Sequence, residues 1–409
     1  MTPITMPRLF SHFPAQRPVL TALALSLGAA IALGLSRFSY GLLLPPMRAD
    51  LGWSYLLAGV MNTGNAFGYF LGALITPMLM RRYRAHSLLT GGAVLTGIFM
   101  LVSGMVTATG FLLLQRILAG ISSALIFIAG GVLISRLGGL HAARAGLLIG
   151  LYYGGTGFGI TLSALLVPAT LAAAQAQHVE HAWQWPWLAM GAACLLATIV
   201  MSLPVRAIQD LPGQAGAKSA FSIKAFGFGL AGYFMFGAGY IGYMTFVVAL
   251  LKEQGMPAPA ITAFYSLLGL AVLASSRIWA GMLDRYKGGQ SLAILTALAG
   301  VAALLPALSS NVFAVFVSGM LFGAVFLSAV ASTTALVRHN ARPEAWSAGI
   351  SAFTTVFALG QIVGPSIVGW IADGQGGLER GLIFSGLTLL VGGMLAWQQK
   401  PLESRDSAQ

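Results

Sequence analysis

An arginine, Arg37, lies inside the first long apolar run of the sequence, which extends from about residue 18 to residue 46. A charge near the centre of a membrane-spanning segment costs about 2.5–3.5 kcal/mol on insertion scales. No Asp or Glu lies within a few helical turns of Arg37 in its own segment. The residue therefore needs an aqueous cavity, a partner on another helix or an anionic ligand.

Two further arginines, Arg116 and Arg277, also fall inside apolar runs. No Asp or Glu lies at the centre of any apolar run to pair with these guanidinium groups. This pattern favours an anionic ligand bound between or near them. A structural alternative stays open for each arginine. Arg37 could bond to carbonyl groups where helices pack, and Arg277 could pair with Asp284, seven residues later. If Arg37 and Arg277 face one cavity, an anion that binds both would stabilise the state in which the two halves close around it.

Polar and aromatic residues follow helical spacing in several of the apolar runs, as Asn62, Asn65 and Tyr69 do. Phenol and amide groups would be unsatisfied in lipid, which favours an inward orientation. Stripes of this kind also occur as plain packing surfaces, and that alternative remains. The candidate substrate-binding residues are Arg37, Tyr40, Asn62, Asn65, Arg116, Tyr152, Tyr153, Tyr240, Tyr243, Arg277 and Gln361.

The composition places these residues in a membrane protein. The chain has 409 residues, of which 57% are hydrophobic and 8% charged, and this excludes an ordinary soluble enzyme. Its net charge of +12 comes from basic residues in short loops, so we expect no nucleic-acid partner. The single cysteine, Cys194, excludes a disulfide framework. No spacing typical of a metal site, a cofactor loop or a catalytic nucleophile stands out, so we expect no enzyme, cofactor or metal.

The apolar runs recur along the whole chain, and each is long enough to cross a bilayer core of about 30 Å. We therefore predict an all-α membrane protein with twelve spans. They cover residues 18–46, 54–80, 86–107, 109–136, 142–173, 183–204, 223–251, 257–283, 289–309, 311–337, 344–372 and 379–398.

The distribution of Lys and Arg predicts the orientation of these spans. With the N-terminus inside, sixteen basic residues fall on inner segments and three, Arg48, Lys252 and Arg380, on outer loops. Since inner loops carry the excess of Lys and Arg in membrane proteins, both termini are expected to be cytoplasmic. The predicted location is a bacterial inner membrane.

The longest inner connection divides the spans six and six. We predict an N-terminal tail (1–17), a first six-helix bundle (18–205), a cytoplasmic linker (206–222), a second bundle (223–399) and a C-terminal tail (400–409). A shift of 203 residues places Gly34 on Gly237 and Gly120 on Gly323, so the halves look like repeats. Two parallel repeats imply a substrate site near the midplane between them.

These features resemble the major facilitator superfamily over nearly the whole chain. The segment from Gly281 to Gly288, with Asp284 and Arg285, is similar to that superfamily's inner-loop motif, and its first-half copy keeps Arg81 and Arg82 but lacks the aspartate. Arg116 to Gly120 resembles the arginine–glycine motif of span 4. The SRFSYGLLLPPM run and residues 152–160 look most like the YbfB/YjiJ-type branch.

The resemblance implies roles for some of these residues. It implies gating by Arg81, Arg82, Gly281, Asp284, Arg285, Gly360, Gly364 and Pro365, the last three being similar to a glycine–proline motif of exporters. It ties Arg116 to proton coupling or structure. It also likens Arg277 to an arginine that grips the substrate carboxylate in oxalate- and monocarboxylate-type transporters.

We therefore expect a monomeric secondary transporter that moves a small solute by alternating access, most simply an organic anion such as a carboxylate. Proton coupling would need the substrate or an end-of-span acid such as Asp373, because no span centre carries Asp or Glu. One alternative is a proton-driven exporter of drugs or metabolites. Another, of a different class, is a membrane sensor or scaffold that transports nothing.

Overall fold

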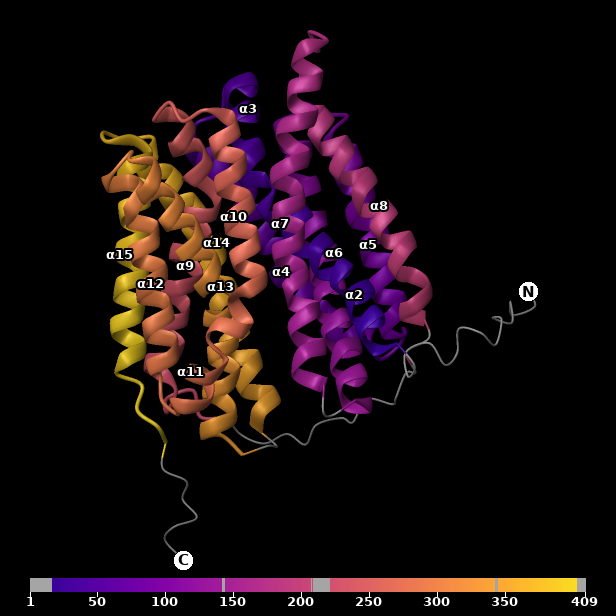
Figure 1. Cartoon of the computed structure of the whole chain (residues 1–409), viewed down its shortest axis with the longest axis vertical. Helices are drawn as coiled ribbons and strands as arrows, with labels where there is room; N and C mark the ends of the chain where they lie inside the picture. The colour runs from indigo at the N-terminus through magenta and orange to yellow at the C-terminus, as the bar shows by residue number, and fades with distance from the viewer. Residues whose placement is uncertain (1–16, 142–143, 207, 209–220, 343–344, 403–409) are drawn as a thin grey trace, which may run out of the picture. The chain divides into compact units, whose positions relative to one another are not determined.

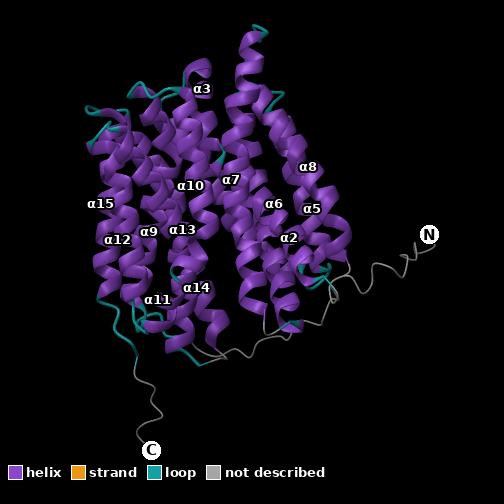
Figure 2. Cartoon of the chain, in the orientation of Figure 1, coloured by secondary structure: helices purple, strands orange, loops and turns teal. Residues whose placement is uncertain are grey.

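A computed structural model describes residues 17–141, 144–206, 208, 221–342 and 345–402. Helices occupy nearly all of this part of the chain, and no strand occurs within it (Figure 2). The fold is therefore all-α, as the sequence predicts. The predicted tails and the 206–222 linker fall largely outside the described residues.

The helices follow one another along the chain with short connections (Figure 1). They are α2 (Pro18–Ala29), the π-helix η2 (Ala30–Phe38), α3 (Tyr40–Leu51), α4 (Tyr55–Leu79), α5 (Ala85–Ser103), α6 (Thr109–Leu140), α7 (Ala145–Ala176), α8 (Gln184–Arg206), α9 (Gly227–Glu253), α10 (Ala258–Ile278), α11 (Ala280–Arg285), α12 (Gln290–Leu308), α13 (Val312–Asn340), α14 (Trp346–Ala372) and α15 (Gly377–Trp397).

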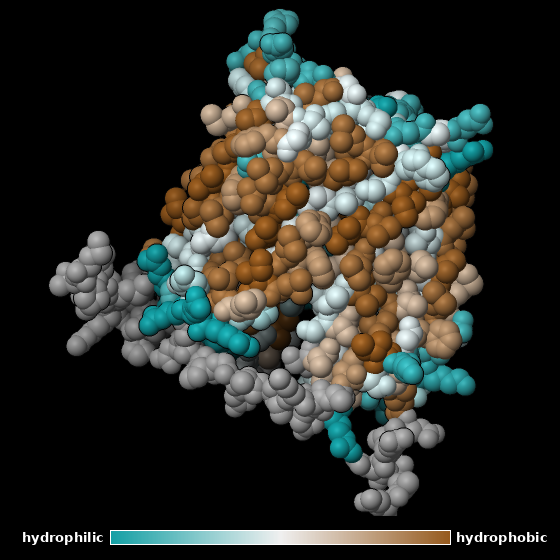
Figure 3. Space-filling view, turned by 180° about the vertical axis from the view of Figure 1, so that it is seen from behind, coloured by the Kyte–Doolittle hydropathy of each residue, from teal (hydrophilic) through white to brown (hydrophobic). Residues whose placement is uncertain are grey.

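Eleven of the described helical segments are long and apolar enough to cross a membrane. Helix α4 is not among them, because Asn62 and Asn65 lie near its middle, although it occupies the position of the second predicted span. The count of twelve therefore stays a prediction. On the face seen in Figure 3, hydrophobic residues cover the middle of the helices and hydrophilic residues gather toward their ends.

Two predicted spans differ in detail from the helices observed. The first is interrupted by the π-helix η2 and continues through Pro45 and Pro46 to Leu51. The eighth breaks at Trp279, whose indole nitrogen donates a hydrogen bond to the Ala324 carbonyl at 2.9 Å. Trp279 leaves helical geometry with a φ of −106°, and the chain resumes as the short helix α11.

The described helices form two compact units, and each is considered separately. The first contains residues up to Ser39 and from Gly68 to Pro212, and the second contains Tyr40 to Phe67 and everything from Gly213 on. The predicted boundary between the bundles stays a prediction. The observed units differ from it because α3 and the first part of α4 pack against helices of the second half, chiefly α9 and α14.

Glycines allow close helix contact in both units. In the first, a Cβ atom on Gly34 of η2 would lie 2.5 Å from the Cα of Gly159 on α7. In the second, a Cβ on Gly237 of α9 would lie 2.6 Å from the Phe357 carbonyl oxygen on α14. Since Gly34 and Gly237 are 203 residues apart and each meets the fifth predicted span of its own half, the contacts agree with the internal repeat.

Replacement of Gly155 by Ala tests this packing. A Cβ there would lie 2.0 Å from the Ser26 carbonyl oxygen, so α7 would have to move away from α2. We expect Gly155→Ala to destabilise the protein by about 1–3 kcal/mol, measured as a lower midpoint of thermal unfolding in detergent. Gly146→Ala, on the same helix with open space around its Cβ, is the control and should be neutral or slightly stabilising. Equal stability of the two variants would contradict the contact.

Candidate functional site

Arg37 lies on the π-helix η2, and its side chain is 3% exposed. Its guanidinium carbon is 5.5 Å from the ring centroid of Tyr69 on α4, within the range of a cation–π contact. π-Helical turns are rare and occur frequently at functional sites. The sequence predicts a helix here but carries no signal for its irregular pitch.

Arg116 on α6 reaches the same turn of η2. Its Nη1 donates a hydrogen bond of 2.8 Å to the carbonyl of Ser36, the residue before Arg37. The Ser36 and Ser123 hydroxyls lie 3.2 Å apart and join the same two helices. The bond to a carbonyl favours the structural alternative for Arg116, since it supplies a dipole partner for the charge.

Tyr69, which contacts Arg37, has two further tyrosines of the first unit near it, Tyr152 and Tyr153 on α7. The Tyr152 hydroxyl donates to the Phe127 carbonyl at 2.9 Å, and the rings of Tyr152 and Tyr153 meet edge to face at 5.0 Å. Tyr69 and Tyr153 both lie close enough to Tyr152 to interact with it electrostatically. Tyr152 is fully buried and Tyr153 is partly exposed. We call Arg37, Tyr69, Tyr152 and Tyr153 the arginine–tyrosine cluster.

The first unit has an uneven distribution of charge. Within its described residues the acid is Glu180, which lies in the turn between α7 and α8, so the helices of this unit contain no Asp or Glu. Arg37 and Arg116 are both buried in these helices. A negatively charged ligand beside the arginine–tyrosine cluster would therefore meet attraction and no carboxylate repulsion.

In the second unit, several predicted polar residues join helices. The Tyr40 hydroxyl donates to the Ala58 carbonyl at 2.9 Å, and the Asn62 amide nitrogen donates to the Thr245 hydroxyl at 2.6 Å. Asn65 and Gln361 are also buried. These contacts give Tyr40 and Asn62 a packing role, and their predicted contact with substrate stays a prediction.

Aromatic rings form a continuous stack on helices α9, α13 and α14. Tyr240 stacks against Phe236, Phe326 and Phe357 with centroids 5.1–5.4 Å apart. Tyr243 stacks on Phe322 at 4.2 Å, and its hydroxyl lies 2.8 Å from that of Ser318. Both tyrosines therefore lie within a packed aromatic layer. The sequence shows only their helical spacing and does not predict this layer.

Arg277 is exposed on the second unit, in the last turn of α10. Among the described residues no hydrogen bond or ion pair joins it to Asp284, so the structural alternative of that pair is not observed. Arg277 and Arg37 belong to different units, and their approach across one cavity stays a prediction.

The predicted gating residues fall into two groups. Five are exposed in turns or on the short helix α11, namely Arg81, Arg82, Gly281, Asp284 and Arg285. The other three, Gly360, Gly364 and Pro365, lie where α14 meets its neighbours. A Cβ on Gly364 would lie 2.2 Å from the Ala238 carbonyl oxygen on α9, and a Cβ on Gly59 of α4 would lie 2.3 Å from the Pro365 carbonyl oxygen. Their gating role remains a prediction.

A further group at one end of the second unit was not predicted as a gate. The carboxylate of Asp373, at the C-terminal end of α14, accepts hydrogen bonds from the Tyr55 and Leu56 amides at 2.7 and 2.8 Å. The Tyr55 hydroxyl donates to Glu253, and the Arg48 guanidinium carbon lies 3.7 Å from the Tyr55 ring centroid. We call Arg48, Tyr55, Glu253 and Asp373 the Asp373 cluster.

The Asp373 cluster has a clear electrostatic basis. A carboxylate at the end of its own helix meets the negative pole of that helix, which is unfavourable. At the start of α4 the same carboxylate meets a positive pole and two amide groups that have no partner within the helix. The sequence shows an acid at the end of a span, but it does not show which helix start that acid would cap.

The described residues of the first unit include groups suited to binding a ligand. Within the described residues no group of three or more His, Cys, Asp or Glu side chains is arranged to hold a metal ion. The arginine–tyrosine cluster offers a cation and phenol groups, which suit recognition of an anion. The close helix contacts at glycine provide surfaces along which helices can slide.

Comparison with known proteins gives the class of protein. The fold is similar to a bacterial homolog of the human lysosomal transporter Spinster, solved in an inward-facing and unoccupied conformation, with a TM-score of 0.71 and 14% identity over 96% of this chain and 97% of that one. It is also similar to the nucleoside transporter NupG, with a TM-score of 0.69 and 15% identity over 94% and 100% of the two chains. The chain has the fold of an MFS-type transporter.

A match to a sequence family identifies the protein more narrowly than the similarity in fold does. Residues 29–397 match the family described as "Uncharacterised MFS-type transporter YbfB", and the chain belongs to that family. It is also similar to an Agrobacterium vitis protein described as "Putative tartrate transporter", with 22% identity over 400 residues, covering 88% of this chain and 85% of the relative. The predicted superfamily and branch are thus confirmed, and the chain is a multi-pass membrane transporter.

Substitution of Asp373 tests the role of its carboxylate as a helix cap. Asp373→Ala removes both acceptors from the first turn of α4, and we expect a loss of about 1 kcal/mol in stability, measured by thermal unfolding in detergent. Asp373→Asn keeps one oxygen acceptor and should lose less. Glu379→Gln, which neutralises another exposed acid of the same unit, is the charge control. A loss in Glu379→Gln as large as that in Asp373→Ala would contradict a specific cap.

Proposed function

We propose that this protein is a secondary transporter of a small organic anion, with Arg37 as the main charge contact for a substrate carboxylate. The observation that carries the proposal is the burial of Arg37 beside the ring of Tyr69, in a unit whose described helices contain no acid. The similarity to a protein described as a tartrate transporter supports the same class of substrate.

The chemistry of the arginine–tyrosine cluster fits a carboxylate. A guanidinium presents a planar fork of donors that pairs with two carboxylate oxygens, and this geometry is more specific than that of an ammonium group. Phenol groups can donate to a carboxylate or to a substrate hydroxyl. The hydroxyl of Tyr152 already donates to Phe127, so the partly exposed Tyr153 is the better candidate for donating to substrate. Arg116 then acts chiefly by holding the turn that presents Arg37.

The second half contributes a further cation in this proposal. Arg277 is exposed at the end of α10, next to the break at Trp279, and has no ion-pair partner among the described residues. A dianionic substrate with a carboxylate at each end would engage Arg37 and Arg277 together. Such a ligand stabilises the state in which both contacts are made, and this differential affinity would drive the conformational change.

The Asp373 cluster provides a gate in the same proposal. By the distribution of Lys and Arg, it lies at the outer ends of the helices, and both termini lie in the cytoplasm of a bacterial cell. Opening a path from that side requires α4 and α14 to part, which breaks the bonds from Asp373 to the start of α4. If protons drive transport, Asp373 is the acid whose protonation would loosen this contact.

Counterflow of radiolabelled tartrate in proteoliposomes tests the role of Arg37. We expect Arg37→Gln to lower the initial rate at least tenfold, because a neutral amide cannot compensate the carboxylate charge. Arg37→Lys should keep the charge but lose the paired geometry and give an intermediate rate. Arg144→Gln, which removes an exposed charge of the same unit, should transport as wild type does.

Matched measurements separate the possible outcomes. Thermal unfolding of each variant shows whether a low rate reflects loss of folded protein. A folded Arg37→Gln variant that transports dicarboxylates at the wild-type rate would overturn the assignment of Arg37. If wild type moves no dicarboxylate or monocarboxylate but lowers the drug susceptibility of an efflux-deficient host, the exporter alternative replaces the anion proposal.

The paired arginines generate a separate prediction about substrate charge. We expect Arg277→Gln to weaken counterflow of dicarboxylates more than counterflow of monocarboxylates, since it removes the contact for a second carboxylate. Competition by succinate and lactate against labelled tartrate measures this difference as a ratio of half-inhibitory concentrations. An unchanged ratio in Arg277→Gln would contradict the contact of Arg277 with substrate.

A further inference from the structure

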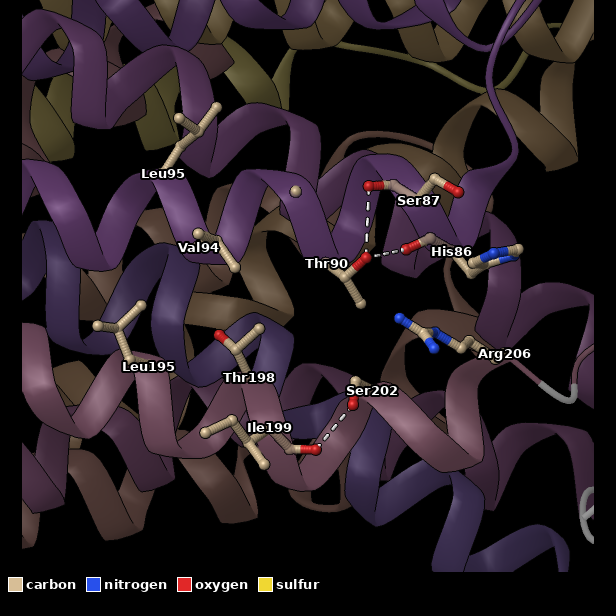
Figure 4. Close-up of a pocket in the computed structure, with 11 residues that line it drawn as sticks. His86, Ser87, Thr90, Val94, Leu95, Leu195, Thr198, Ile199, Ser202 and Arg206 are labelled. Carbon is tan, nitrogen blue, oxygen red and sulfur yellow. Dashed lines mark hydrogen bonds between the residues drawn. The ribbon is translucent and has the colours of Figure 1, made fainter. Parts of the chain in front are cut away.

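A pocket of about 870 Å³ lies between helices α5 and α8 of the first unit (Figure 4). None of its lining residues belongs to the arginine–tyrosine cluster or to the Asp373 cluster. The residues that line it are His86, Ser87, Thr90, Gly91, Val94, Leu95, Leu195, Thr198, Ile199, Ser202 and Arg206.

The polarity of the pocket changes along its length. His86, Ser87 and Thr90 come from the first turns of α5, and Ser202 and Arg206 come from the last turns of α8. Figure 4 shows the guanidinium of Arg206 at this end, on the side of the pocket facing His86 and Thr90. One end of the pocket therefore carries hydroxyl groups, an imidazole and a fixed positive charge.

The other end of the pocket is apolar. Val94 and Leu95 on α5 and Leu195 and Ile199 on α8 line this end (Figure 4). Val94, Leu95 and Ile199 are exposed, and so are Ile98, Leu196 and Val200 beside them. Since these helices are long and apolar enough to cross a membrane, this surface is of the kind that contacts acyl chains.

The charges at the polar end select a negative group. Arg206 makes no hydrogen bond or ion pair with any residue in the described part of the chain. Helix α5 starts at Ala85 without a side-chain cap, so the positive pole of its dipole lies beside the same end of the pocket. No acidic residue lines the pocket. Anions are stabilised by such an arrangement of cation, hydroxyl groups and helix start.

We propose that this pocket binds one anionic phospholipid, with its phosphate group against Arg206 and the start of α5, and an acyl chain along Val94, Leu95, Leu195 and Ile199. A phospholipid matches both ends at once, whereas a soluble phosphate would use the polar end alone. The predicted topology places the polar end at the cytoplasmic surface, where basic pockets between transmembrane helices meet anionic headgroups. We call this site the α5–α8 lipid site.

Gly91 gives a means of closing the site without disturbing the fold. It lines the pocket, and a Cβ atom built on it meets no atom within 4 Å. Gly91→Leu should therefore fill the space that an acyl chain would use, and it replaces glycine inside a helix by a better helix former. Gly146→Leu, at an exposed helical glycine of α7 with equal space, is the matched control.

Native mass spectrometry of the full-length protein in detergent tests the proposal. With equal amounts of phosphatidylglycerol and phosphatidylcholine added, we expect wild type to carry one phosphatidylglycerol with about fivefold preference, the effect of one interfacial cation. Arg206→Gln should abolish this preference, and Arg144→Gln should retain it. Gly91→Leu should lower binding of both lipids, and Gly146→Leu should bind as wild type does.

Three results would overturn the α5–α8 lipid site. They are an equal uptake of both lipids by wild type, an unchanged preference in Arg206→Gln, and unchanged binding in Gly91→Leu. Displacement of the lipid by millimolar inorganic phosphate would also overturn it, because the apolar end would then add nothing to binding. Thermal unfolding of each variant confirms that the protein measured is folded, and none of these results depends on the transported substrate.

Discussion

Burial of positive charge among apolar helices is the constraint on which the first unit depends. Arg37 and Arg116 are both almost fully buried, and the described helices around them contain no acid. Dipoles and aromatic rings offset part of the cost of burying these two charges: Arg116 bonds to the Ser36 carbonyl, and Arg37 lies against Tyr69. Neutral groups offset only part of the desolvation of a guanidinium. In the proposed function, the carboxylate of the substrate adds a charged partner for Arg37.

In the second unit the described acidic residues lie at or near helix ends, whereas in the first unit two arginines are buried within the helices. The bonds that Asp373 makes to the start of α4 bind two helices that are far apart in the sequence. Glycines bring the same helices close, because a Cβ on Gly369 would lie 2.3 Å from the Tyr55 carbonyl oxygen. Contacts made through a few hydrogen bonds and small residues can separate at modest cost. In the proposed function, these contacts form the gate.

Much of the fold was predictable from the sequence, and the reasons are physical. Long apolar runs leave a chain no alternative to helices in a membrane, so the ends of α5, α12 and α14 fall within a few residues of the predicted spans. Glycine matches at one offset predicted the repeat, and Gly34 and Gly237 each pack against the fifth predicted span of their own half, α7 and α14. The polarity of α4 was also visible, since Asn62 and Asn65 were selected for their type and spacing.

The partners of individual side chains were not predictable in the same way. Their position inside apolar runs identified Arg37 and Arg116 as cations that need a partner, but whether a guanidinium meets a carbonyl depends on the packing of helices that are distant in sequence. Helical periodicity could not show that Tyr40 bonds to the Ala58 carbonyl or that Tyr240 lies within a stack of rings. Asp373 was noted as an acid at a helix end, yet its role as a cap depends on the position of Tyr55, more than 300 residues earlier.

The π-helix from Ala30 to Phe38 also constrains how this stretch can vary. Each residue of an α-helix turns the chain by about 100°. A single deletion that restored regular α-helical pitch would therefore rotate everything beyond it, and Tyr40 would no longer point at the Ala58 carbonyl. The number of residues in this turn matters as much as their identity. Relatives that differ in length between Ala30 and Phe38 should differ in the whole face that α3 presents.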